Sequence, residues 1–200
     1  MRWRDWTRIT SMSGWLSRAL RFPWRKRWRR RPSPTAVGLS RSSHWQLAEA
    51  VTRGAVGVSA PITLVELPFS LADASHAGTV AELASRGVGV VAASALAGGA
   101  LTGKYRHSTP ADSRAASPHL RHMVEPYLSG FARGVIEAAH RAASGLDRST
   151  ADVALAWVRD YPGVSSALVG PRTVRQLDTL LEYTEPLPDP IRQVLAEVAQ

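Results

Sequence analysis

The sequence predicts an α/β fold in which about four parallel strands are covered by helices. The first observation is a set of short apolar runs that favour β structure, at residues 35–40, 62–67, 88–94 and 164–170. The second is that each run is followed by a segment with helical periodicity. Strands that are apolar on both faces are typical of parallel sheets covered by helices, so the candidates are a doubly wound sheet or part of a (β/α)8 barrel.

The helical segments follow the strands in the order that such a fold requires. Residues 76–87 place Val80 and Leu83 on one side and end at Gly87, a common helix stop. Residues 149–160 begin with Ser149 or Thr150 as the N-cap. A polar loop at 106–123 separates the third strand from its helix. The other helices are predicted at 44–51, 129–143, 174–184 and 189–200.

Residues 1–34 form a basic leader that differs from the rest of the chain. The net charge of the protein is +9, but the leader holds eleven of the 25 Lys and Arg and one of the 16 acidic residues, a net of +10. Residues 35–200 therefore carry 14 basic and 15 acidic residues, a net of −1. Five of the seven tryptophans also lie in the leader. We expect two parts: a disordered or irregular leader at 1–34 and a folded domain at 35–200.

Three interpretations of the leader compete. A basic, aromatic segment could bind anionic lipid or nucleic acid, with Arg on phosphates and Trp at the interface. It could instead be a disordered tail. It could also be no selected protein segment, since 23 Arg against two Lys reflects GC-rich codons and such leaders arise from a wrong start or reading frame. Because basic runs are unspecific motifs, the second and third interpretations together are favoured over the first.

Composition excludes several other classes of protein. There is no cysteine, so disulfides, thiolate metal sites and cysteine nucleophiles are excluded, and a reducing, cytoplasmic location fits. No window approaches the roughly 20 apolar residues that span a bilayer. The leader lacks the apolar stretch of a signal peptide. The histidines at 119 and 122 have no acidic or cysteine ligand at metal spacing, so no metal site is predicted.

Candidate functional residues lie at the carboxyl ends of the predicted strands. In a (β/α)8 barrel these ends meet on one face and carry the site. The predicted strands end at Ser40, Glu66, Ser94 and Gly170, with Arg172 two residues further on. The third strand runs into the small-residue turn of GVVAASALAGGALTGKY at 89–105, where glycines allow close approach of the backbone to a ligand or simply a tight turn.

Three segments together resemble the C-terminal half of the aldo/keto reductase family. They are GLSRSSHWQLAEA at 38–50, GVGVVAASALAGGALTGKY at 87–105 and ADVALAWVRDYPGVSSALVGPRTVRQL at 151–177. The resemblance runs from about Val37 to the end of the chain and follows the family's order and spacing. It implies strands five to eight of a (β/α)8 barrel in an enzyme that reduces carbonyls with NADPH.

The resemblance also implies a set of cofactor contacts. The turn with Ser94, Leu96 and Gly98 would wrap the pyrophosphate of the dinucleotide, and Lys104 would add a charge nearby. GPRTVRQL at 170–177 is similar to the family's Gly-x-Arg-x-x-x-Gln motif. Arg172 would then hold the 2′-phosphate of NADP, with Gly170 and Gln176 beside it. The alternative for Arg172 is a solvated side chain at a helix start, where the macrodipole disfavours a cation.

Other positions depart from the family pattern. The family usually has Asn where Arg41 stands, Gln where Glu66 stands, an aromatic ring at Ala93 and Asn at Leu180. The contacts to phosphate therefore look retained and those to nicotinamide eroded, while Ser40 and Glu66 stay among the candidate cofactor-binding residues.

The family's catalytic Asp, Tyr, Lys and His all belong to the N-terminal half of the barrel, and residues 1–34 contain neither Tyr nor His. We therefore expect an aldo/keto reductase-like chain that is truncated, binds NADP(H) weakly and is inactive alone. A second copy or a separate N-terminal half would cover the open sheet face. A non-catalytic nucleotide-binding or interaction module is the alternative. A protein that binds membrane or nucleic acid through its leader comes third.

Overall fold

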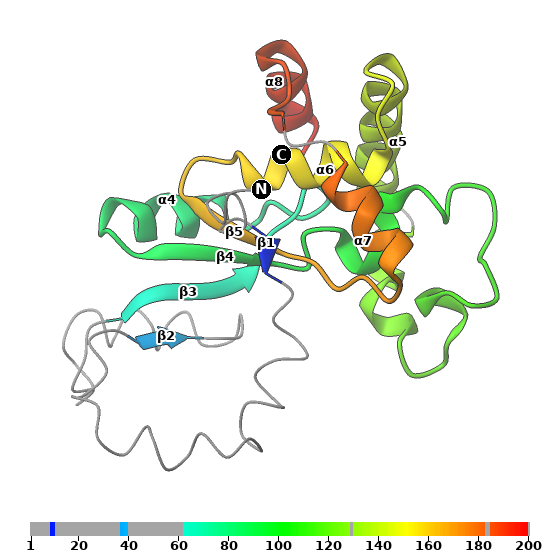
Figure 1. Ribbon diagram of the computed structural model, residues 1–200, viewed down its shortest axis with the longest axis horizontal. Helices are drawn as coiled ribbons and strands as arrows, with labels where there is room; N and C mark the ends of the chain where they lie inside the picture. Colours follow the sequence, from blue (N-terminus) through cyan, green and yellow to red (C-terminus); the bar gives the residue numbers. More distant parts are fainter. Residues whose placement is uncertain (1–8, 11–36, 40–61, 129, 183–184, 200) are drawn as a thin grey trace.

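A parallel β-sheet with helices packed on it forms the centre of the computed structural model (Figure 1). The structure describes residues 9–10, 37–39, 62–128, 130–182 and 185–199. Within these ranges the strands are β1 (Ile9–Thr10), β2 (Val37–Leu39), β3 (Ile62–Pro68), β4 (Gly89–Ala93) and β5 (Val164–Leu168). Their order across the sheet is β1-β5-β4-β3-β2, and every neighbouring pair is parallel.

The predicted parallel α/β fold is confirmed, and the four predicted strands coincide with β2 to β5. The arrangement is consistent with part of a (β/α)8 barrel. The pairing of β1 with β5 was not predicted, because residues 9 and 10 lie in the leader. Ile and Thr are β-branched and suit a strand, and the edge of β5 offers backbone groups for pairing. The rest of the leader, Ser40, Arg41 and the predicted helix at 44–51 lie outside the described residues.

The described helices follow the predicted segments closely. Gly87 has φ of +72° and comes directly after the C-cap residue Arg86, which confirms it as the stop. Ser149 is the N-cap of the central helix, because its hydroxyl accepts the N–H of Asp152 at 3.0 Å. The helices are α4 (Ala77–Ser85), α5 (Gly130–Gly145), α6 (Thr150–Arg159), α7 (Val174–Leu181) and α8 (Asp189–Val198).

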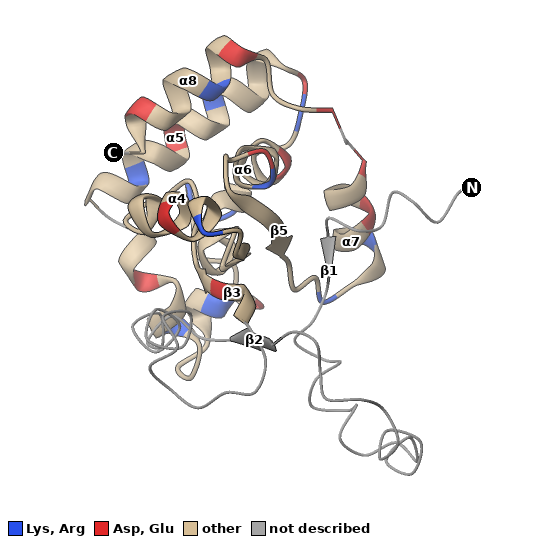
Figure 2. Cartoon of the chain, turned by 90° about the vertical axis from the view of Figure 1, so that its left-hand side faces the viewer, with Lys and Arg blue, Asp and Glu red and all other residues tan. Residues whose placement is uncertain are grey.

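The core lies between the sheet and helices α4 and α6. Val65 and Leu67 of β3 and Val90 and Ala92 of β4 are each at most 2% exposed. Because side chains alternate along a strand, Glu66 lies on the opposite face of the sheet, beside Val91 of β4. Helix α6 is buried from Thr150 to Val158, and α5 and α8 lie side by side beyond it (Figure 2).

An aromatic cluster joins the end of β3 to α6. The ring of Phe69 stacks on Trp157 with centroids 5.7 Å apart and meets Tyr161 edge to face at 4.7 Å. Trp157 and Tyr161 are 5.0 Å apart. Phe69 also extends the sheet by donating its N–H to the carbonyl of Ala93 at 3.0 Å. The cluster therefore fixes α6 relative to the carboxyl ends of β3 and β4.

The predicted polar loop at 106–123, with the residues that lead from it to α5, contains several short 3-10 turns. After η3 (Ala97–Thr102) it contains η4 (Arg114–Ala116), η5 (Arg121–Met123) and η6 (Glu125–Tyr127), which together lead into α5. The side chains of Ala115 and Val124 are buried, so the loop is packed on the domain at these points. It projects from the end of the sheet near α7 (Figure 1).

Candidate functional site

The turn after β4 is built from residues with positive φ. Ser94 has φ of +56° and Ala97 has +49°, although neither is glycine, and Gly98 and Gly99 have +64° and +102°. Left-handed φ at a non-glycine residue costs of order 1–3 kcal/mol and tends to occur at functional sites. Successive backbone N–H groups in such turns form concave surfaces that bind anions. The backbone of this turn is therefore suited to a phosphate group.

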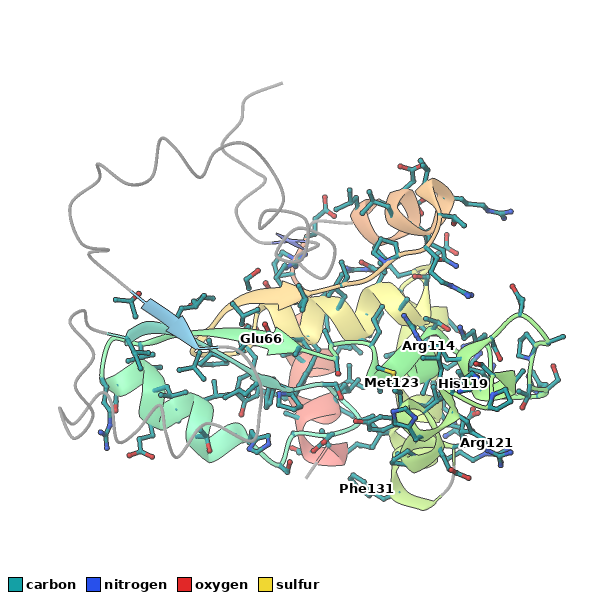
Figure 3. The ribbon with its side chains drawn as sticks, turned by 90° about the horizontal axis from the view of Figure 1, so that it is seen from below. Glu66, Arg114, His119, Arg121, Met123 and Phe131 are labelled. Atoms are coloured by element: carbon teal, nitrogen blue, oxygen red, sulfur yellow. The ribbon has the colours of Figure 1, made fainter. Side chains whose placement is uncertain are left out.

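Gly98 is required by the packing of the loop over the turn. A Cβ atom at Gly98 would lie 2.6 Å from the carbonyl oxygen of Met123. The carbonyl of Gly98 accepts a hydrogen bond from Nη1 of Arg114 at 3.1 Å. Arg114 and Met123 lie close to the end of β4 (Figure 3). The space beside Gly98 is thus occupied by protein backbone, which is a different reason for glycine from the phosphate approach that the resemblance implied.

Gly99, rather than Gly98, faces the cationic groups of the site. A Cβ atom at Gly99 would lie 3.2 Å from Nζ of Lys104 and 3.7 Å from Nη1 of Arg114. Within the described ranges neither side chain forms an ion pair with a carboxylate. Two neighbouring positive charges without an acidic partner favour an anion between them. We call this arrangement of Lys104 and Arg114 around Gly99 the cradle.

Arg114 and Gly99 were missed by the sequence analysis. Arg114 lies ten residues beyond Lys104 in the polar loop, and nothing in the sequence predicts that the loop returns to the turn. The signal that could have drawn attention to it is the order Lys104, Arg114 in a segment that follows a glycine-rich turn. The polar loop returns to the turn where Met123 approaches Gly98, and this is a tertiary contact.

Tyr105 helps to hold Lys104 and the loop together. Nζ of Lys104 lies 5.0 Å from the centroid of the Tyr105 ring. The phenol oxygen accepts the N–H of Ala115 at 3.4 Å. Burial alone would raise the pKa of Tyr105, but the neighbouring Ser113 hydroxyl, the hydrogen bond from Ala115 and the charge of Lys104 lower this pKa below its usual value. The Tyr105 hydroxyl is therefore part of the network that connects η4 with Lys104.

Arg172 and Gln176 form the second predicted element, at the beginning of α7. Thr173 is the N-cap, and its hydroxyl accepts the N–H of Gln176 at 3.2 Å. Oε1 of Gln176 accepts the backbone N–H of Arg172, the residue before the N-cap, at 2.8 Å. Nη2 of Arg172 donates to the carbonyl of Asp112 in the polar loop at 3.1 Å. Gln176 thus orients the Arg172 backbone, and Arg172 is anchored to the loop rather than fully solvated.

The remaining predicted residues lie at different depths. Glu66 is half-buried on the sheet face opposite the helix-covered core, while Gly170 is exposed and a Cβ there would meet nothing within 4 Å. Leu96 accepts the N–H of Gly99 at 2.8 Å through its carbonyl, so its backbone shapes the turn. Leu180, at the position where the family has Asn, is 7% exposed and belongs to the core.

The polar loop brings the two predicted elements together at one end of the sheet. Arg114 contacts the carbonyl of Gly98, and two residues earlier in the same loop Asp112 contacts Arg172. Lys104, Arg114 and Arg172 therefore border one region beyond the carboxyl ends of the parallel strands. This is where ligands bind in parallel α/β folds. The fold and this cationic region define the class: a parallel α/β protein with basic side chains gathered beyond the carboxyl ends of its strands.

The chain belongs to the aldo/keto reductase family, whose family model matches residues 35–193. It is 37% identical over 125 residues to the Escherichia coli "Protein tas" and 30% identical over 150 residues to the Bacillus subtilis "Uncharacterized oxidoreductase YrpG". These matches cover 60% and 74% of this chain and 35% and 44% of the relatives.

A plant relative also matches the chain. The rice "Probable voltage-gated potassium channel subunit beta" is 32% identical over 103 residues, which is 51% of this chain and 31% of the relative. The matches thus span between about a third and under a half of the length of these relatives. The resemblance to the family that the sequence motifs indicated is confirmed.

The part of the chain that the structure describes contains neither a membrane-spanning helix nor a metal cluster. No described helix combines the length and apolar character needed to cross a bilayer. No group of three or more His, Asp or Glu residues in the described ranges is placed to hold a metal ion. His119 extends from the outer part of the polar loop (Figure 3).

Proposed function

We propose that the chain supplies the cofactor-binding part of an aldo/keto reductase-type oxidoreductase and binds NADP(H) through its phosphates. The observation that carries the proposal is the cradle at Gly99, where Lys104 and Arg114 approach the same point without an acidic partner among the described residues. The positive φ values from Ser94 to Gly99 support it, because such backbone binds phosphate oxygens through N–H groups.

Selection of NADP over NAD depends on Arg172 in this proposal. A guanidinium group has five N–H donors in a planar fork, and one of them is used by the carbonyl of Asp112. The other donors suit the dianionic 2′-phosphate of NADP. Within the described residues no carboxylate forms an ion pair with Arg172. Gln176 fixes the Arg172 backbone, and the open space at Gly170 leaves room for the ligand.

Carbonyl reduction needs more than cofactor binding. NADPH supplies a hydride when it is bound, and a proton donor must act on the carbonyl oxygen. No Asp, Tyr, Lys and His at the family's spacing is found in these 200 residues. We therefore propose that this chain does not reduce carbonyls by itself and that a separate N-terminal half contributes the catalytic residues. A second copy could cover the open sheet face but would bring no catalytic set. A cytoplasmic location is part of the proposal, because the chain has no cysteine.

The test is titration calorimetry of the full chain with NADP, NAD and 2′-phospho-AMP. We expect NADP and 2′-phospho-AMP to bind with similar Kd values and NAD about tenfold more weakly, as one lost charge-assisted contact implies. Arg172→Ala should remove this difference and leave NAD binding nearly unchanged. Arg175→Ala is the matched control, because Arg175 is also exposed on α7.

Gly170→Ala adds a variant that should fold normally, because its Cβ meets nothing in the protein. A loss of NADP affinity in this variant would support close approach of the ligand to Gly170. Equal Kd values for NADP and NAD, or unchanged NADP binding in Arg172→Ala, would contradict the assignment of Arg172.

A non-catalytic nucleotide-binding module is the second candidate. It is favoured by the missing catalytic set and by relatives from rice and Arabidopsis thaliana that are named as probable potassium channel subunits. The two candidates differ when a generic aldehyde and NADPH are added together with an N-terminal half of a related reductase. Restored NADPH oxidation supports the oxidoreductase, whereas NADP binding without turnover supports the module. Turnover by the chain alone would contradict both.

A further inference from the structure

A pocket separate from the predicted cofactor residues lies between the β3–α4 connection and helices α5, α6 and α8. Its volume is about 470 Å³. Pockets of about 300–1,000 Å³ hold small organic ligands. None of the eight predicted cofactor-binding residues that the structure describes lines it. The pocket is therefore a different site from the one considered above.

The walls of this pocket are apolar and aromatic. Alanines from residues 72–77 and from α8 line it together with Trp157 and Tyr161. Phe131, at the beginning of α5, stands at the wall with 60% of its surface exposed (Figure 3). An exposed phenylalanine beside a hollow with buried aromatic rings favours an apolar ligand group, and the faces of such rings attract cations.

Asp73 is the one ionisable acid that lines the pocket, and no Lys, Arg or His is among the described lining residues. Its Oδ1 accepts the hydroxyl of Ser75 at 2.6 Å and the N–H of Ser75 at 3.3 Å. Neither partner carries a charge. Within the described residues no cation pairs with Asp73, so its charge is held in place but not neutralised.

The effect of this charge reaches a neighbouring tyrosine. Burial raises the pKa of Tyr127, and the negative charge of Asp73 raises it further. Tyr127 lies in η6, just before α5. The negative charge of Asp73 is therefore felt by half-buried groups near the pocket. A positive charge beside Asp73 would be stabilised by the same carboxylate.

We propose that this pocket binds a small organic cation, whose ammonium group pairs with the Asp73 carboxylate and whose apolar group lies against Phe131, Trp157 and Tyr161. The proposal is independent of dinucleotide binding, because it uses other residues and another kind of charge. It identifies the ligand by chemistry: an amine with an aromatic or aliphatic body.

The probes are three small molecules with the same aromatic ring and opposite or absent charges. 2-Phenylethylammonium carries the cation, 2-phenylethanol is a neutral analogue of the same chain length, and phenylacetate is an anion. Calorimetric titration of the full chain should show that the ammonium binds at least tenfold more tightly than the alcohol. Phenylacetate should not bind measurably at this site.

Asp73→Asn is the decisive variant, because asparagine keeps the acceptor for Ser75 and removes the charge. It should weaken binding of the ammonium about tenfold and leave the alcohol unchanged. Asp178→Asn on α7 is the matched control, since Asp178 is exposed and lies outside the pocket. Ala196→Phe should fill the pocket and abolish binding of both ligands.

Equal affinities for ammonium and alcohol would overturn the proposal, as would unchanged binding in Asp73→Asn or no binding of the ammonium. The comparison of Asp73→Asn with Asp178→Asn decides the matter even if Ala196→Phe does not fold. Thermal unfolding followed by far-UV circular dichroism checks that the other two variants keep the parent structure. NADP binding does not depend on the outcome of the ammonium titrations. The proposals of NADP binding and of cation binding can therefore fail separately.

Discussion

Replacing Gly98 with alanine should destabilise the protein in two ways, through backbone strain and through a steric clash. Substitutions at two other glycines serve as controls that separate these effects. At φ of +64° an L-residue costs about 1–2 kcal/mol. The new Cβ would also lie 2.6 Å from the carbonyl oxygen of Met123, and overpacking of this kind costs typically about 1–3 kcal/mol. The expected loss in the free energy of unfolding is therefore about 2–5 kcal/mol.

Two control variants separate these effects. Gly87 has φ of +72° but nothing within 4 Å of its Cβ position, so Gly87→Ala should lose only about 1–2 kcal/mol. Gly78 lies in α4 with no positive φ and open space around it. Gly78→Ala should therefore raise stability by about 0.5–1 kcal/mol. Urea unfolding followed by circular dichroism gives all three values.

The comparison of Gly98→Ala with Gly87→Ala tests whether the polar loop packs on the turn. If the two variants lose the same stability, the Met123 carbonyl does not lie against Gly98 and the loop is not held there. Because the same loop carries Arg114, that result would also remove the structural basis for the cradle at Gly99. A larger loss of stability in Gly98→Ala, accompanied by weaker NADP binding, agrees with the packing of the loop on the turn and with the cradle at Gly99.

Three further predictions concern other parts of the chain. Asp152 is 2% exposed in its side chain and pairs with Arg148, so Asp152→Ala should lower the free energy of unfolding by about 3–5 kcal/mol in urea denaturation, and a loss under 1 kcal/mol would contradict a buried pair. In an alkaline titration followed at 295 nm, Tyr105 should ionise before Tyr127, because the pKa of Tyr105 is lowered and that of Tyr127 is raised. Tyr105→Phe should remove an early component of the absorbance change and Tyr127→Phe a late one, whereas the reverse order would refute both environments. Any binding to anionic vesicles or duplex DNA should reside in residues 1–34, so that deleting them removes it with its salt dependence, and binding kept by residues 35–200, with a net charge of −1, would show that the leader is not responsible.

The strands and helices were predictable because their signals are local. β-rich runs of six or seven residues located β3, β4 and β5 to within about two residues, because such runs bounded by turn residues are a local signal. The expectation of strands apolar on both faces fits β4, whose three central residues are buried, better than β3, where buried and more exposed residues alternate. Gly87 and Ser149 marked helix ends through backbone conformation and capping, which also depend only on neighbouring residues. The resemblance to a family supplied the rest, because it placed these strands in a barrel.

The site was only partly predictable, because its geometry depends on contacts between distant segments. The glycine-rich turn and the Arg172 motif were identified from sequence, but the carbonyl of Met123, which also demands glycine at position 98, was not foreseen. Arg114 was missed because it reaches Gly98 from 16 residues further along the chain. Capping of α7 by Thr173 and Gln176 gives Gln176 a structural contact that the motif alone did not indicate.

The polar loop couples the two candidate phosphate elements, and this coupling determines how variants of Arg172 should be interpreted. Arg172 donates to Asp112, while Arg114, two residues later, donates to Gly98. Arg172→Ala therefore removes a charge and also one hydrogen bond to the loop that carries Arg114, while the bond from Arg114 to Gly98 remains. Arg172→Lys keeps the charge and a donor for Asp112 but lacks the planar fork that matches a phosphate in a bidentate way. If Arg172→Lys binds NADP as weakly as Arg172→Ala does, the fork is what recognises the 2′-phosphate; if it binds as the parent does, the charge and the attachment of the loop are sufficient.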